Sequence, residues 1–171
     1  LSPDGPFPLL AVHGEQGSGK TTGCRMLRAL VDPHSAGLRG VPRDDRSLMI
    51  STRHGWLLGF DNLSSLPPWL SDLLCGIATG TATAARSLYT DDGEALFQAK
   101  RPILLNGIEE VATRADLLDR CLVVSFQTIP EERRRPEAEL WAACQTARPR
   151  IFGALLDALA CALRQLPQVK L

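Results

Sequence analysis

The stretch Gly14-Glu15-Gln16-Gly17-Ser18-Gly19-Lys20-Thr21 decides the fold of this chain. It fits the pattern G-x-x-x-x-G-K-[ST] with no mismatch. An apolar run from Phe7 to His13 predicts a buried strand directly before it, and apolar periodicity predicts a helix from Thr21 to Val31 directly after it. A strand, a glycine-rich loop and a helix in this order indicate an α/β fold that binds phosphate at a helix N-terminus.

Each residue type in this loop has a physical role in binding a nucleoside triphosphate. Glycines let the backbone curl so that successive N–H groups point at phosphate oxygens. Lys20 is expected to reach the β and γ phosphates, and Thr21 to hold Mg²⁺ through its hydroxyl. No motif in the sequence reads the base, so GTP stays an alternative to ATP. We expect ATP and Mg²⁺ as cofactors, with the nucleotide bound by Gly14, Glu15, Gln16, Gly17, Ser18, Gly19, Lys20, Thr21 and Thr22.

The composition is that of a globular protein without a strong overall charge. Of 171 residues, 44% are hydrophobic and 22% are charged, and the formal net charge is zero. Binding to nucleic acid would therefore need a local basic patch. Five widely spaced cysteines predict reduced thiols and a cytoplasmic location. Asp157 and Arg164, inside the apolar stretch Ile151 to Leu166, exclude a membrane span there.

Strand and helix signals alternate through the first three quarters of the chain. Further strands are predicted at Gly55–Asp61, Arg101–Asn106 and Cys121–Phe126. Further helices are predicted at Asp44–Arg53, Trp69–Ala78, Glu137–Ala147 and Pro149–Leu166. This alternation predicts a parallel sheet with helices on both faces, followed by a helical appendage.

Two segments depart from this alternation. Asp32–Arg43 is rich in proline and glycine and predicts a loop with a short strand. Arg86–Thr90 and Glu94–Gln98 flank Asp91-Asp92-Gly93 and predict a β-hairpin. We expect a core over residues 1–128 and a helical lid or linker over 129–171. Because the chain begins at Leu1 rather than Met, we also expect a fragment of a longer protein.

Asp61 is the candidate for the second metal-holding residue. It directly follows the apolar run Trp56 to Phe60, and a buried strand that ends in a carboxylate is the usual way to hold Mg²⁺ beside a phosphate loop. The alternative is that Asp61 only caps a turn.

Two further polar residues could sense the γ-phosphate. Asn106 follows the apolar run Pro102 to Leu105 and could contact the γ-phosphate or its attacking water, or it could only form a turn before Gly107. Arg120 stands just before the strand that starts at Cys121. An arginine supplied to a neighbouring site can stabilise transition-state charge, whereas an ion pair with a nearby aspartate, Asp116 or Asp119, is the alternative.

Together these residues resemble the AAA+ ATPases. GEQGSGKT matches their Walker A, GFDN lies where their Walker B lies, LLN where sensor 1 lies, and LLDR where an arginine finger lies. The stretch TGTATAARSLYTDDGEALFQAKRPILLNGI is similar to the superfamily 3 type helicase domains of phage and mobile-element primase–helicase proteins. The resemblance covers roughly the segment from Leu9 to Phe126.

The resemblance implies a three-layer αβα P-loop NTPase sandwich. Its sheet would have five mainly parallel strands, with a β-hairpin inserted before sensor 1 and helices after the core. It also implies a homo-oligomeric, possibly hexameric ring in which Arg120 reaches the neighbour's site, and DNA as a partner. Arg86 and Lys100 at the hairpin base are the candidate DNA contacts, because the acidic turn Asp91-Asp92-Gly93 would repel phosphate. The implied catalytic residues are Lys20, Asp61, Asn62, Asn106 and Arg120, and the metal would be held by Thr21 and Asp61.

Asn62 departs from the resemblance, because relatives commonly place Glu there. An amide has no basicity at neutral pH and cannot accept a proton from water. Hydrolysis could therefore be slow, giving a switch, or another carboxylate could serve, with Glu15, Glu109 and Glu110 as candidates. Alternatively, positioning and electrostatics suffice, since phosphoryl transfer asks little covalent chemistry of the protein.

Three functions follow from these features. The first is an ATPase motor domain of a mobile-element replication protein that acts on DNA. The second is an ATP-gated assembly module with weak hydrolysis, which Asn62 and the acidic hairpin favour. The third and weakest is a small-molecule kinase in which Arg133-Arg134-Arg135 would clamp phosphate.

Overall fold

The computed structural model describes residues 5–80, 82–86, 94–108 and 114–165. The chain divides into two compact units, Pro6–Pro130 and a second made of Leu1–Gly5 and Glu131–Leu171. Each unit is described by itself.

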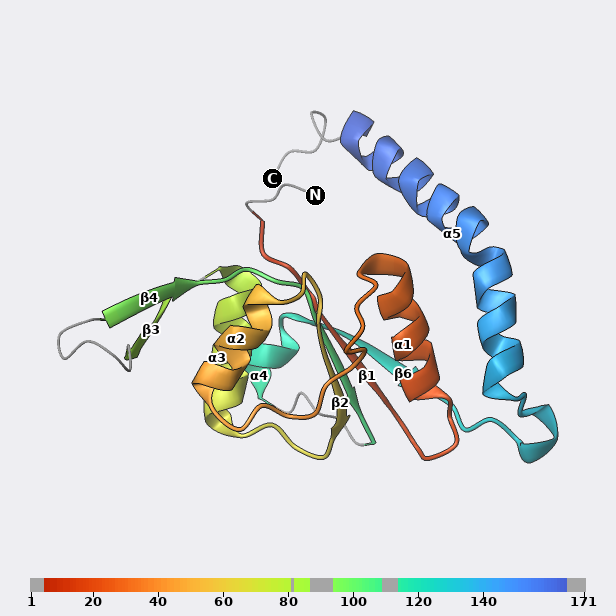
Figure 1. Ribbon diagram of the computed structural model, residues 1–171, viewed down its shortest axis with the longest axis horizontal. Coiled ribbons are helices and arrows are strands. Elements are labelled where there is room, and N and C mark those ends of the chain that lie inside the picture. The colour runs from red at the N-terminus through yellow and green to blue at the C-terminus, as the bar shows by residue number, and fades with distance from the viewer. Residues whose placement is uncertain (1–4, 81, 87–93, 109–113, 166–171) are drawn as a thin grey trace. The chain divides into compact units, whose positions relative to one another are not determined.

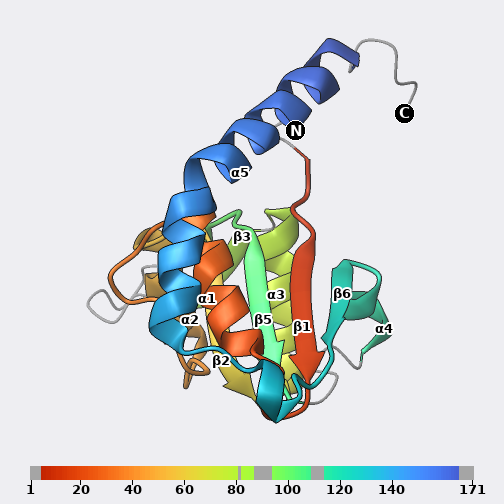
Figure 2. The same ribbon diagram turned by 90° about the vertical axis from the view of Figure 1, so that its right-hand side faces the viewer.

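The first unit is built on a four-stranded sheet in which every pair of neighbours is parallel. Its order is β2-β5-β1-β6. The strands are β1 (Leu9–Gly14), β2 (Leu58–Leu63), β5 (Ile103–Gly107) and β6 (Cys121–Phe126). Figure 2 shows the sheet with β6 at one edge. The predicted parallel sheet is confirmed, and its strands start within three residues of the predicted positions.

Helices cover both faces of this sheet, as alternation along the chain predicts (Figure 1). The helix α1 (Lys20–Val31) packs on one face, where Cys24 joins Val12 and Leu104 in a small core. On the other face, α2 (Asp45–Arg53), α3 (Pro68–Thr79) and α4 (Ala115–Leu118) bury a larger core against strand residues of opposite parity. That core is centred on Leu9, Leu48, Phe60, Leu70, Leu74, Ile77, Ile103, Leu105 and Leu117.

The expected fifth strand is wrong for this chain. Arg39, in the loop where a short strand was predicted, forms an isolated parallel bridge to Phe60. Its N–H donates to the carbonyl oxygen of Gly59 (2.9 Å), and its carbonyl oxygen accepts from the N–H of Asp61 (2.8 Å). β2 becomes irregular directly after this pair, because Asn62 has a left-handed backbone, which fits a bridge that does not lengthen into a strand.

The hairpin before β5 is present, with its first strand earlier than predicted. β3 (Ala82–Arg86) pairs antiparallel with β4 (Glu94–Gln98), and the register places Arg86 opposite Glu94. The prediction started the first strand at Arg86, which the structure makes its last residue. Residues 87–93, including the acidic turn, lie outside the described residues.

The second unit consists largely of one helix, α5 (Glu137–Gln165), preceded by the 3₁₀ turn Glu131–Arg133. Two helices were predicted, with the second one starting at Pro149, but this proline lies inside the single helix α5. A proline in a helix interior removes one backbone hydrogen bond and bends the helix without having to end it. Figure 1 shows α5 bent along its length. None of the helices in the described ranges is both long and apolar enough to cross a bilayer.

We predict that Gly14→Ala destabilises the protein by about 2 kcal/mol or more. A Cβ at residue 14 would overlap the carbonyl oxygen of Phe126, which is backbone and cannot rotate away. Gly40→Ala is the matched control, because a Cβ there meets open space. Thermal denaturation compares the two variants, and equal melting temperatures would contradict the close approach of β1 and β6.

Candidate functional site

The glycine-rich loop leaves the carboxyl end of β1 and enters α1. Gly17 (φ 84°) and Gly19 (φ 74°) have the left-handed backbone that favours glycine, and Gly19 is the N-cap residue of α1. The N–H of Ser18 donates to the carbonyl oxygen of Glu15 (3.3 Å), and the N–H of Ile129 donates to that of Gly17 (3.2 Å). The motif therefore forms a loop that is closed by its own backbone hydrogen bond and attached by a second one to the segment after β6.

Lys20 lies across this loop. Its Nζ donates to the carbonyl oxygen of Glu15 at 3.2 Å, which puts the ammonium group over the curl of backbone between the two residues. The Ser18 hydroxyl is buried and has no hydrogen-bond partner among the described residues. An ammonium group, the N-terminus of a 12-residue helix and an unpaired hydroxyl in one loop make a site for an anion with several oxygens.

Thr21, Asp61 and Asn106 meet beside the loop. The Thr21 hydroxyl donates to Asp61 Oδ1 (3.2 Å), and the Asn106 amide Nδ2 donates to both Thr21 Oγ1 (3.0 Å) and Asp61 Oδ1. The residues come from α1, β2 and β5, and the two strands are adjacent in the sheet. Three residues predicted separately from sequence thus form one hydrogen-bonded cluster.

The cluster offers suitable chemistry for Mg²⁺ and for water. A threonine hydroxyl and a carboxylate are the hard oxygen ligands that Mg²⁺ prefers. Asn106 is 1% exposed, and its Oδ1 is buried with no partner among the described residues. Such an acceptor is satisfied when a bound water donates to it. The residues present therefore fit a metal and an ordered water next to the glycine-rich loop.

Cys24 is a buried residue of α1 whose thiol is affected by the charges of this site. Burial, with a smaller contribution from the charge of Asp61, raises the pKa of its thiol to about 11, and Lys20 opposes the shift. The thiol is therefore protonated at neutral pH and adds no negative charge to the one that Asp61 supplies.

Asn62 has an unusual backbone. It has a left-handed conformation (φ 57°), and the pairing of β2 with β5 shifts register between Phe60 and Leu63. The N–H of Asn62 donates to Asp61 Oδ1 (2.9 Å), whereas its own side chain is exposed. Asparagine tolerates this backbone far better than glutamate does. The bulge therefore explains an asparagine here without a role in proton transfer.

The strand that carries Asp61 ends two residues later than predicted. It was expected to end at Asp61, with Asn62 in the following turn, but β2 continues through Asn62 to Leu63. An apolar pattern cannot show this, because the last residues of β2 alternate between partly exposed, exposed and buried positions around the bulge.

A side-chain clamp joins α1 to β2, and sequence reasoning missed it. Arg28 NH1 donates to the carbonyl oxygen of Leu57 (2.8 Å), and the N–H of Leu57 donates to Asp32 Oδ2 (2.8 Å). Arg28 NH2 and Asp32 Oδ2 are 3.7 Å apart. The spacing of Arg28 and Asp32 by four residues on a helix is the one signal that the sequence holds. The clamp fixes the helix of the glycine-rich loop to the strand of Asp61.

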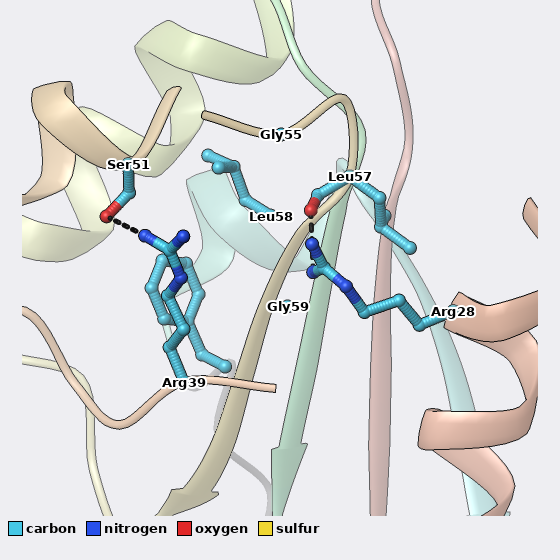
Figure 3. Close-up of a pocket in the computed structure, with 8 residues that line it drawn as sticks. Arg28, Arg39, Ser51, Gly55, Leu57, Leu58 and Gly59 are labelled. Carbon is cyan, nitrogen blue, oxygen red and sulfur yellow. Dashed lines mark hydrogen bonds between the residues drawn. The ribbon is translucent and has the colours of Figure 1, made fainter. Parts of the chain in front are cut away.

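Arg28 lines a small pocket beside β2 with Arg39, and Figure 3 shows the two guanidinium groups on either side of Gly59. Arg28 is 4% exposed, and burial lowers its pKa, with Asp32 opposing and Arg39 adding to the decrease. A Cβ on Gly59 would lie 3.1 Å from Arg28 NH1 and closer still to Leu38. Glycine at this position thus makes room for the clamp.

Arg120 lies far from this cluster. It precedes Cys121, which pairs with Leu9 at the amino end of β1, whereas Gly14 at the other end pairs with Phe126. Five residue steps of parallel strand span about 16 Å. Arg120 NH1 donates to the carbonyl oxygen of Asp116. No ion pair of Arg120 with Asp116 or Asp119 forms within the described residues, and the Asp116 carboxylate instead pairs with Arg114 (3.3 Å).

Three candidate residues have other surroundings. The Glu15 carboxylate accepts from the Thr128 hydroxyl (3.2 Å), at the surface. Lys100 stands before β5 with its ammonium 5.9 Å from the ring centre of Phe7. Arg86 ends β3 in the hairpin. Glu109 and Glu110 lie outside the described residues.

Comparison with known proteins supports the fold and gives a family. The family model described as Actinomycete integrative conjugative element replication protein matches residues 1–167. A crystal structure of JCV helicase with a bound acetamide compound superposes with a TM-score of 0.50 at 12% identity. That match covers 86% of this chain and 42% of the helicase chain, so this chain spans less than half of it. No curated protein matches.

We predict that Asn62→Ala lowers the free energy of unfolding by about 1 kcal/mol and that Asn62→Gly changes it little. Alanine has a Cβ and no polar group that favours the left-handed backbone, while glycine adopts it freely. Chemical denaturation of both variants measures the difference. Equal losses would show that the Asn62 side chain, rather than its backbone, stabilises the site.

Proposed function

This chain belongs to the replication proteins of actinomycete integrative conjugative elements, and we propose that it binds and hydrolyses ATP as a helicase-like motor domain acting on DNA. The observation that carries the proposal is the Thr21–Asp61–Asn106 cluster beside a glycine-rich loop. The resemblance to mobile-element replication proteins is confirmed by the family match, and the helicase-like fold agrees with it.

The loop and α1 would bind the triphosphate. Loop N–H groups and the N-terminal end of α1 face the phosphate oxygens, and Lys20 moves from its bond with Glu15 to the β and γ phosphates. Thr21 would hold Mg²⁺ directly and Asp61 through water, and the ion would neutralise charge on the phosphates. Asp61 is already oriented for this by its bonds to Thr21, Asn106 and the Asn62 backbone.

Asn106 would orient the attacking water. In the structure its Nδ2 donates to Thr21 and Asp61 and its unpaired Oδ1 is buried, so the amide would turn toward the bound nucleotide to accept a hydrogen bond from this water. Phosphoryl transfer has a loose transition state, so alignment of water with the γ-phosphate supplies most of what the protein must provide. Asn62 then contributes to hydrolysis through its backbone N–H, which orients the Asp61 carboxylate, and a glutamate base at position 62 is not required.

Arg120 would act on a neighbouring subunit. About 16 Å of strand separates it from its own glycine-rich loop, too far for a guanidinium group to reach phosphate in the same site. The edge strand β6 beside it exposes Leu122 (59%), Val123 (46%) and Val124 (40%). Apolar residues on a sheet edge are covered in most proteins. We therefore propose a homo-oligomer, in line with the expected ring, with α5 as a lid or linker.

The second candidate is an ATP-gated assembly module that hydrolyses slowly. Asn62 favours it, because its amide cannot accept a proton. For the kinase alternative, Arg133 ends an exposed 3₁₀ turn, which is the usual setting of a solvated charge run. We place the protein in the cytoplasm, where its five free cysteines stay reduced.

We predict that the protein hydrolyses ATP and that single-stranded DNA stimulates this turnover. Lys20→Ala should lower the turnover at least about a hundredfold. Asn62→Gly keeps the left-handed backbone but removes the amide, so it should retain most of the turnover. Steady-state phosphate release measures all three proteins. Tight ATP binding without turnover would contradict the motor and favour the assembly module.

We predict that Arg120→Ala and Lys20→Ala subunits, each inactive alone, recover part of the ATP turnover when mixed. In a mixed assembly, some sites combine the intact loop of an Arg120→Ala subunit with the intact Arg120 of a neighbouring Lys20→Ala subunit. Phosphate release at constant total protein measures the recovery. The matched control is a mixture of Lys20→Ala with Asp61→Ala, whose lesions fall in the same site. Recovery in neither mixture would contradict the role in trans.

A further inference from the structure

Two aromatic and two basic side chains contact one another in a row at the amino ends of the strands, which we call the amino edge of the sheet. Lys100 Nζ is 5.9 Å from the ring centre of Phe7, the Phe7 and Trp56 rings meet edge to face at 5.5 Å, and Arg101 Cζ is 5.2 Å from the ring centre of Trp56. We name these four residues the amino-edge ladder. Cations over aromatic faces are attractive contacts, which makes the order cation, ring, ring, cation a stable one.

The ladder lies opposite the nucleotide site. Phe7 precedes β1, Trp56 precedes β2, and Lys100 and Arg101 precede β5, and these three strands are adjacent in the sheet. The Thr21–Asp61–Asn106 cluster lies at the carboxyl ends of the same strands. A ligand on the ladder is therefore separate from bound nucleotide, but the same strands connect the two.

Hydrogen bonds to neighbouring helices anchor Phe7 and Arg101 of the ladder. The N–H of Phe7 donates to the carbonyl oxygen of Ala78 (2.9 Å), and that of Arg101 donates to Ile77 (3.2 Å), both in α3. Arg101 Nε also donates to the carbonyl oxygen of Thr52 in α2 (3.1 Å). Rigid aromatic groups lose little entropy when a ligand stacks on them.

The surroundings of the ladder are basic although the whole chain is neutral. The three segments that build it, 6–8, 52–56 and 99–102, contain Arg53, Lys100 and Arg101 and no aspartate or glutamate. The carboxylate near Gly55 is that of Asp32, which already binds Arg28 and the Leu57 N–H. The patch therefore presents net positive charge to a ligand.

Trp56 is 49% exposed despite its contacts with Phe7 and Arg101. A tryptophan that only closed the end of the sheet would gain more from full burial. Exposed aromatic rings between cations are the chemistry that binds single-stranded nucleic acid, because any base can stack on a ring while its phosphates pair with nearby cations.

We propose that the amino-edge ladder is a contact for single-stranded DNA, with a base stacked at Trp56 and phosphates beside Lys100 and Arg53. The proposal rests on the proposed function only in taking DNA as the ligand. β4 ends at Gln98, two residues before Lys100, so the ladder continues the base of the hairpin. DNA bound there need not touch the acidic turn, which removes the conflict between that turn and a DNA-binding role.

The test measures how tightly the full chain binds fluorescein-labelled oligothymidylate, by fluorescence anisotropy in the absence of ATP. Trp56→Ala should weaken binding about 5- to 100-fold, and Trp56→Phe should recover part of the loss because it keeps an aromatic face. Lys100→Met should reduce the salt dependence of log affinity by about 0.7, the value for one phosphate contact on a single strand. Phe152→Ala removes an aromatic ring of equal exposure, 49%, and should change nothing.

ATP turnover without DNA, measured on the same variants, separates this proposal from the proposed function. Trp56→Ala should keep the basal turnover, because the ladder lies at the opposite edge of the sheet. DNA binding that depends on Trp56 in a protein without turnover would support the ladder and overturn the motor. Unchanged affinity in folded Trp56→Ala, no binding by the wild type, or binding to duplex alone would each overturn the ladder.

Discussion

One carboxylate oxygen, Asp61 Oδ1, holds the candidate site together. It accepts hydrogen bonds from the Thr21 hydroxyl, the Asn106 amide and the N–H of Asn62. These donors belong to α1, to β5 and to the bulge of β2, so one oxygen fixes three elements. A partly buried carboxylate with three donors is held in one orientation, which is what a metal-holding group requires.

Unusual backbone conformations gather around this oxygen. Gly17, Gly19 and Asn62 have left-handed backbones, and Gly14 approaches the backbone of Phe126 too closely for any side chain. Such positions cost stability and persist where the surrounding structure holds them in place. Here the clamp of Arg28 and Asp32 on Leu57 provides that support, because it binds the helix after the loop to the strand before the bulge.

The two ends of the strands differ in chemistry. The loop, Asp61 and Asn106 lie at the carboxyl ends, and they suit a triphosphate and a metal. Arg120, the hairpin and the amino-edge ladder lie at the amino ends, and they suit a neighbouring subunit and single-stranded DNA. β5 has Arg101 before its first residue and Asn106 near its last, so it directly connects a residue of the ladder with the candidate sensor of the γ-phosphate. Rigid strands of this kind can carry a coupling between two sites.

Much of the fold could be predicted from the sequence, because its signals are local. The Gly14–Thr21 motif, the apolar runs and the alternation of strands and helices predict a parallel sheet with helices on both faces, and the structure has it. The fifth strand, which the resemblance implied, was wrong because the proline- and glycine-rich segment around Arg39 forms only an isolated bridge to Phe60. The C-terminal segments are helical as predicted, but the break between two helices was wrong, because a proline such as Pro149 can lie inside a helix when most of the helix's other hydrogen bonds remain.

The sequence by itself determined the residue types of the site: the loop, a carboxylate after an apolar run, and an asparagine after another. Only the tertiary structure decided that Thr21, Asp61 and Asn106 bond to one another, that Asn62 has a left-handed backbone, and that Arg120 lies at the other edge of the sheet. It also brought together Phe7, Trp56, Lys100 and Arg101. The physical reason is that these relations depend on strand order and register, which long-range pairing sets and local sequence patterns do not encode.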